Sequence, residues 1–184
     1  MDLTHSPSVA TDLLNSEHRT ILSVLDVLDA ACSSFEAGEA VPANVVPDLV
    51  RFFREYADDF HHAKEENILF LRYHDRGMPR GFGPVAVMMH EHDAGREHLA
   101  AFERAFAAGN RAATALAGRD FSGLLRAHID KEDEVLYPMG NRILSADDQA
   151  WLLREFDRVA RERFGAAALA DFDALVNRLT KQLF

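Results

Sequence analysis

Several features are scarce in this sequence of 184 residues, and each scarcity excludes a class of protein. Cys32 is the only cysteine, so a framework of intrachain disulfides is excluded. Basic residues (20) are outnumbered by acidic residues (30), and the net charge of −10 argues against a nucleic-acid or anionic-membrane partner. The chain has no run of roughly 18 uncharged apolar residues and no apolar signal core at its start, so the cytoplasm is the expected location.

Glycine and proline are also few, and segments that alternate between polar and apolar residues are missing, whereas Ala, Leu, Arg and Glu are plentiful. This composition favours an all-α protein. The spacing of apolar residues between the breaks predicts helices over about 12–35, 44–75, 84–108, 111–143, 146–164 and 166–183. Gly118 is a candidate for interrupting the fourth helix, Pro138 is expected to bend or end it, and Ser145 is a plausible N-cap for the fifth.

A stretch of eleven residues occurs twice without a gap, at 60–70 and 127–137. His61 aligns with His128, and Glu65 aligns with Glu132, so each copy reads H-x-x-x-E. On an α-helix, residues that are four positions apart lie on one face, about 40° and one turn apart. An imidazole and a carboxylate in this arrangement can reach one point beside the helix, which is the geometry of a metal site.

A weaker echo precedes each copy, because a Glu-His dipeptide ends at His18 and again at His92. The chain therefore resembles two copies of one helical hairpin, which supply His18, His61 and Glu65 in the first and His92, His128 and Glu132 in the second. Each histidine lies about 25 Å of helical rise from its hairpin turn, so the histidines of a hairpin are expected at one level. Burying six such groups without a metal would cost many kcal/mol, so all six are predicted to be metal ligands.

The other candidate residues are assigned away from this site or left open. His62 and Glu66 lie about 100° from the ligand face and are not expected to bind metal. The histidines expected at the surface are His74, His90 and His98. Tyr56 and Tyr137 lie within about a turn and a half of the ligands, and each is either a hydrogen-bond donor to the site or a packed residue at its rim.

The ordered motifs E-H, H-H-x-K-E-E, E-H and H-I-x-K-E-D resemble those of the hemerythrin-like, or HHE cation-binding, family. The resemblance covers residues 12–143 and implies an up-down-up-down four-helix bundle around a non-haem di-iron centre with an oxo or hydroxo bridge. It implies four terminal histidine ligands and two bridging glutamates, which are His18, His61, His92, His128, Glu65 and Glu132. Residues 1–11 are then expected to be a flexible tail, and 144–184 a pair of additional helices that pack on the bundle or on a partner.

One departure from the family pattern concerns the third helix. The oxygen-carrying members have two histidines four residues apart there, whereas the positions four residues from His92 are Met88 and Arg96. The chain is in this respect similar to the four-histidine members, which include the iron–sulfur repair proteins, although it lacks their N-terminal cysteine-bearing domain. With two histidines and the shared carboxylates at each iron, an open position on both irons is expected.

Nitrogen and oxygen donors without a thiolate suit iron or manganese, and zinc could bind adventitiously. The first hypothesis is a centre that binds or reacts with O2, peroxide or NO in sensing, scavenging or a stress response, with peroxidase-like, catalase-like or NO-related oxidoreductase activity left open. The second is non-catalytic iron storage or sensing, or reversible O2 binding. A histidine phosphotransfer bundle needs one exposed histidine and fits the paired ligands poorly. The sequence identifies no protein partner and no oligomeric state.

Overall fold

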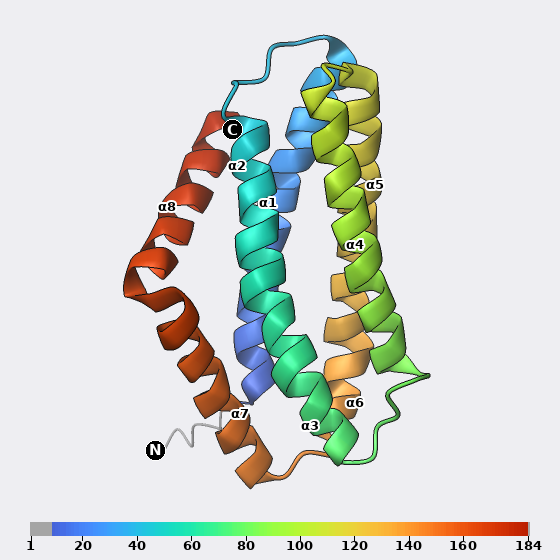
Figure 1. The fold of residues 1–184 in the computed structure, drawn as a ribbon, viewed down its shortest axis with the longest axis vertical. Helices are drawn as coiled ribbons and strands as arrows, with labels where there is room; N and C mark the ends of the chain where they lie inside the picture. The colour runs from blue at the N-terminus through green and yellow to red at the C-terminus, as the bar shows by residue number, and fades with distance from the viewer. Residues whose placement is uncertain (1–8, 184) are drawn as a thin grey trace, which may run out of the picture.

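The computed structural model describes residues 9–183, and all regular structure in that range is helical. Four long helical rods run up, down, up and down, and a fifth, bent rod lies along one side of them (Figure 1). The predicted all-α bundle with additional C-terminal helices is therefore confirmed. Of the predicted tail, residues 1–8 lie outside the described range, whereas Ala10 and Thr11 are buried in the first helix.

The first rod is α1 (Ala10–Ala37) and the third is α4 (Pro84–Ala107). The second rod, residues 45–75, consists of α2 (Val45–Phe52), the π-helical segments η1 (Phe53–His62) and η2 (Glu65–Leu69), and α3 (Phe70–Asp75). The fourth rod, residues 111–141, consists of α5 (Arg111–Lys131), the π-helical turn η3 (Glu132–Leu136) and α6 (Tyr137–Asn141). The C-terminal rod, residues 146–183, consists of α7 (Ala146–Val159), η4 (Ala160–Phe164) and α8 (Gly165–Leu183). No helix in residues 9–183 has a stretch long and apolar enough to cross a membrane.

Both rods that carry an H-x-x-x-E motif pass through a π-helical turn at the same place in the repeat. η2 begins at Glu65 and η3 begins at Glu132, and these two residues align with each other. Pro138 lies two residues after η3 and has no N–H to donate, but η2 has the same wider turn with Leu71 at the aligned position, so the turn does not depend on the proline. The fourth rod continues to Asn141 instead of ending at the proline.

The apolar core is divided into two clusters with a polar layer between them. On α1, Leu14 belongs to one cluster and Ile21 to the other, and His18 lies between them. On the fourth rod the order is reversed, as antiparallel packing requires, with Ile129 in the cluster of Ile21 and Leu136 in the cluster of Leu14. The predicted ligands therefore lie at the level where the two apolar clusters meet.

The C-terminal rod packs on the bundle itself, with α7 against α1 and η2, and α8 against α1 and α2. Its side chains in the core are Leu152 and Phe156 from α7 and Leu175 and Leu179 from α8. As the sequence predicts, Ser145 is the N-cap of α7, and its hydroxyl accepts a hydrogen bond from the N–H of Asp148 at 3.2 Å. Gly165 bends the rod with a φ of 72°, a left-handed value that glycine adopts without strain.

Gly118 lies inside α5 without interrupting it, so that expectation from the sequence is wrong. A Cβ atom at this position would lie 2.4 Å from Sγ of Cys32 and 3.2 Å from the ring of Phe102. The glycine is therefore required by packing, because its missing side chain lets α5 lie against α1 and α4.

We expect Gly118→Ala to lower the free energy of unfolding by about 1–3 kcal/mol, because the added methyl group overfills a packed core. Gly123→Ala is the matched control on the same helix: a Cβ there has no neighbouring atom within 4 Å, so this change should be neutral or stabilise by up to about 1 kcal/mol. Urea denaturation measures both values. Adding Cys32→Ala to Gly118→Ala should recover part of the loss, and equal stability of the two glycine variants would contradict the close packing.

Candidate metal centre

The middle of the bundle is a layer of buried histidine and glutamate side chains. The first rod contributes His18, the second contributes His61 and Glu65, the third contributes His92, and the fourth contributes His128 and Glu132. Each of these six residues exposes 1% or less of its surface. The structure thus brings together, at one level, all six residues that the sequence singles out.

Each glutamate carboxylate lies between imidazoles from two different rods. The Oε2···Nε2 distances are 3.6 Å from Glu65 to His61, 3.5 Å from Glu65 to His92, and 3.3 Å from Glu132 to both His18 and His128. Possible ligand atoms form two groups, and within each group they lie within 4.8 Å of one another. The first group consists of His18, His61, Glu65 and Glu132. The second group consists of His62, Glu65, His92 and His128. Glu65 belongs to both groups, so its carboxylate lies where it can bridge two ions.

Several of the inward-facing atoms lack a hydrogen-bond partner among the described residues. They are Nε2 of His61, Oε2 of Glu65 and both carboxylate oxygens of Glu132. A buried polar group left without a partner costs about 1–3 kcal/mol. Imidazole nitrogens and carboxylate oxygens that converge in this way are the donors that iron and manganese take, so these residues fit a metal centre.

The outward-facing ring nitrogen of each of these histidines is held by a carboxylate on the neighbouring rod. The Nδ1···O distances are 2.7 Å from His18 to Asp133, 2.9 Å from His61 to Glu17, 2.7 Å from His92 to Glu66, and 3.1 Å from His128 to Glu91. A carboxylate in this position keeps the proton on Nδ1 and leaves the lone pair of Nε2 free to face the centre. The four contacts join the rods in a closed ring: first to second, second to third, third to fourth, and fourth to first.

These four carboxylates are not predicted as site residues from the sequence, although a signal for them is visible in it. Glu17 and Glu91 directly precede a candidate histidine, and Glu66 and Asp133 directly follow a candidate glutamate. Since neighbours on a helix lie about 100° apart, a residue beside an inward-facing ligand points toward the adjacent rod. The acidic residue beside each ligand is therefore the pattern that could have identified the ring.

Lys64 and Lys131 align in the repeat and form ion pairs with Glu17 and Glu91, but their surroundings differ. The side chain of Lys64 is 2% exposed and that of Lys131 is 46% exposed. The ammonium group of Lys64 lies 5.9 Å from the ring centroid of Phe156 in the C-terminal rod. Burial lowers the pKa of Lys64 and raises the pKa of Glu17. The two copies of this ion pair therefore differ at the lysine, which is buried in the first copy and exposed in the second.

Burial and neighbouring charges set the protonation of the metal-free centre. Burial, and then the ring of His18, lower the pKa of His61 well below its usual value, so His61 is neutral and can donate a lone pair. Burial and the nearby carboxylate of Glu132 raise the pKa of Glu65 well above its usual value. Burial also acts to raise the pKa of Glu132, but the rings of His128 and His18 outweigh it and hold that pKa well below its usual value. Glu65 therefore tends to hold a proton that metal binding must release.

The two tyrosines that the sequence leaves open have different roles. Tyr137 donates a hydrogen bond to Oε1 of Glu65, and its ring stacks on His18 with centroids 5.6 Å apart. Tyr56 stacks on Phe52 and meets Phe172 of α8 edge-on. Tyr137 thus orients a carboxylate of the centre, whereas Tyr56 packs against the C-terminal rod.

His62 lies in the central layer, so the expectation that it points away from the ligand face is wrong. It is 7% exposed, its ring stacks on His92 with centroids 3.9 Å apart, and it belongs to the group of Glu65, His92 and His128. The expectation assumed α-helical winding, whereas His62 is the last residue of the π-helical segment η1. Of the histidines expected at the surface, His74 and His90 are exposed and His98 is half-buried.

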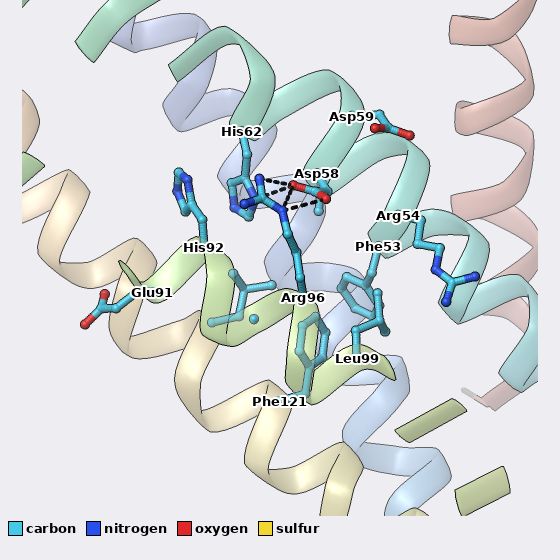
Figure 2. Close-up of a pocket in the computed structure, with 13 residues that line it drawn as sticks. Phe53, Arg54, Asp58, Asp59, His62, Glu91, His92, Arg96, Leu99 and Phe121 are labelled. Carbon is cyan, nitrogen blue, oxygen red and sulfur yellow. Dashed lines mark hydrogen bonds and ion pairs between the residues drawn. The ribbon is translucent and has the colours of Figure 1, made fainter. Parts of the chain in front are cut away.

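A pocket of about 300 Å³ lies beside the central layer, between the second rod and α4 (Figure 2). His62 and His92 lie at one end of it, and its apolar lining includes Phe53, Leu99, Phe121 and Leu125. The ion pair of Arg96 and Asp58 crosses this pocket, with its shortest N···O distance at 2.7 Å (Figure 2). The pocket therefore offers a small molecule a mostly apolar space next to two histidines of the centre.

Comparisons with known proteins agree with this site. The family model described as the hemerythrin HHE cation binding domain matches residues 9–140. Relatives include the uncharacterized proteins Rv1995 of Mycobacterium tuberculosis (strain H37Rv) and Mb2018 of Mycobacterium bovis, each 23% identical over 179 residues. The similar region covers 94% of this chain and 68% of each relative. No solved structure matches the chain.

The unequal surroundings of the two lysines give a paired test of stability. We expect Lys64→Met to lower the free energy of unfolding of the metal-free protein by about 3 kcal/mol, because it breaks an ion pair whose lysine is buried and leaves the half-buried carboxylate of Glu17 without its cation. Lys131→Met removes an exposed partner from Glu91 and should cost less than about 1 kcal/mol. Urea denaturation in the presence of a chelator measures both, and equal losses would contradict the difference in burial.

Proposed function

This chain belongs to the hemerythrin HHE cation-binding family, and on that premise we propose that its central layer holds two iron ions in a non-haem centre that binds or reacts with O2, peroxide or NO. The observation that carries this proposal is the layer of buried nitrogen and oxygen atoms that converge from all four rods. Among them, Nε2 of His61, Oε2 of Glu65 and both carboxylate oxygens of Glu132 have no hydrogen-bond partner among the described residues. Leaving such atoms unpaired in a protein interior is costly, and a bound cation would satisfy them.

The proposed ligands divide between two ions. His18 and His61 would hold one ion, His92 and His128 would hold the other, and Glu65 and Glu132 would be shared between them. Support for this division comes from the placement of each carboxylate between imidazoles of two rods, at 3.3–3.6 Å. An oxo or hydroxo group would complete the bridge between the ions, as the family resemblance implies.

Two bound iron ions would supply the redox electrons and the coordination positions for a small ligand. The residues of the chain would hold the ions and orient the side chains that bind them. Tyr137 fixes one oxygen of Glu65 so that the other faces the centre, and the carboxylates at Nδ1 keep the histidine rings in one tautomer. The apolar clusters above and below exclude water, which strengthens every electrostatic contact in the layer.

Non-catalytic iron storage or sensing, or reversible binding of O2, is the alternative function. The pocket beside His62 and His92 favours a centre that admits a small ligand over one that only stores iron, because storage does not need an apolar approach to the ions. Histidine phosphotransfer is disfavoured, because that reaction needs an accessible ring and all histidines of the central layer are buried.

Iron content is the first test. We expect the protein loaded with Fe²⁺ without oxygen and then desalted to hold about two iron atoms per chain. Glu65→Ala and Glu132→Ala should each lose at least one iron, because each removes a bridge. Glu134→Ala is the control, since Glu134 is an exposed acidic residue two positions after Glu132. Elemental analysis measures the content, and full retention of two irons in both bridge variants would refute the assignment.

Reactivity separates the proposed function from iron storage. We expect the reduced, iron-loaded protein to change its absorbance within seconds of mixing with NO or hydrogen peroxide, with an amplitude that saturates at high ligand concentration. The same protein freed of iron is the control and should show no change. A stopped-flow experiment in which the iron-loaded protein gives no saturable signal with either ligand would favour storage instead.

A further inference from the structure

We propose that His62 is a fifth histidine ligand of the centre, at the position formed by Glu65, His92 and His128. This inference rests on the proposed dinuclear function and makes its two halves unequal. One of the ring nitrogens of His62 lies within 4.8 Å of ligand atoms of all three of these residues. The ring lies 5.6 Å from that of His128 and 3.9 Å from that of His92, centroid to centroid.

The winding of the second rod explains how two adjacent histidines can both face the centre. In an α-helix, His61 and His62 would point about 100° apart. η1 is π-helical up to His62, and the N–H of Ala63 bonds back to the carbonyl of Asp58, five residues earlier. This wider turn rotates less per residue, so neighbouring side chains diverge less. His61 therefore joins one group of ligand atoms and His62 joins the other.

His62 also has a carboxylate at its outer nitrogen, as the other four histidines do, although this one lies on its own rod. Its Nδ1 lies 3.4 Å from Oδ1 of Asp58, so its second nitrogen is free to face the centre. Asp58 is held by Arg96 through contacts of 2.7–3.0 Å, and Arg96 also binds Glu66 at 2.7 Å, the carboxylate at Nδ1 of His92. One guanidinium group thus contacts the outer partners of both His62 and His92, and Figure 2 shows its contacts with Asp58.

With this assignment, the third rod does not need to supply a second histidine ligand. The position four residues after His92 is Arg96, which cannot donate a lone pair. His62 instead approaches from the second rod and takes the place that the third rod leaves open. The aligned residue in the repeat is Ile129, which lies in the apolar core, so the other half has no equivalent donor. The centre then has two histidines at one ion and three at the other.

The test measures how fast a chelator removes iron from the loaded protein. Two variants remove the donor nitrogen: His62→Ala, and His62→Phe, which keeps an aromatic ring to stack on His92. We expect both to release one of the two irons at least about tenfold faster than the unmutated protein, because a ligand is lost. His90→Ala is the control, because His90 is exposed and lies two residues from His92. It should release iron at the unmutated rate.

Added imidazole provides a second measurement, and it should have no effect on iron release if His62 only packs against its neighbours. In His62→Ala the pocket borders the vacated space, so millimolar imidazole should enter and slow iron release toward the unmutated rate. His62→Phe fills that space and should not respond. If His62→Phe keeps iron as the unmutated protein does, or if imidazole has no effect on His62→Ala, the inference is overturned. An unmutated protein that holds fewer than two irons would refute the proposed function and this inference with it.

Discussion

The structure depends on the burial of carboxylates and imidazoles at the middle of a four-rod bundle. Glu65 and Glu132 are fully buried, and their inward oxygens find no hydrogen-bond donor among the described residues other than Tyr137 at one oxygen of Glu65. Such a layer is unfavourable unless a cation satisfies it, whereas apolar side chains at the same positions would pack without penalty. The two apolar clusters provide the stability that lets the bundle hold this unfavourable layer in place.

In the ring of carboxylates around the layer, an acidic residue on one rod fixes the orientation of a histidine on the neighbouring rod. Every contact at Nδ1 joins a histidine on one rod to an acidic residue on the next. A shift of any rod along the bundle axis would therefore disturb two histidines at once. The π-helical turns η2 and η3 also affect the orientation of side chains. Each begins at a glutamate of the centre and changes the direction of the side chains that follow it.

Sequence patterns were sufficient for the features that follow α-helical periodicity. The ends of the rods, the repeat and the convergence of His18, His61 and Glu65 with their counterparts all follow from spacing, caps and breaks. The errors arose where tertiary contacts decide the local structure. The expectation for His62 is wrong because no recognisable residue pattern encodes π-helical winding, and the expectation for Gly118 is wrong because the glycine is required by its contact with the sulfur of Cys32 on another rod. The carboxylate ring is not predicted, because which acidic residue contacts which histidine depends on which rods are neighbours.

The C-terminal rod carries no residue of the central layer, yet it distinguishes the two copies of the repeat. Phe156 lies near Lys64, whose counterpart Lys131 stands in water. Dissolved ions screen exposed charges over a Debye length of about 8 Å at physiological ionic strength, but they act far less on buried pairs. Dissolved salt is therefore expected to weaken the pair of Lys131 and Glu91, beside His128, more than the pair of Lys64 and Glu17, beside His61.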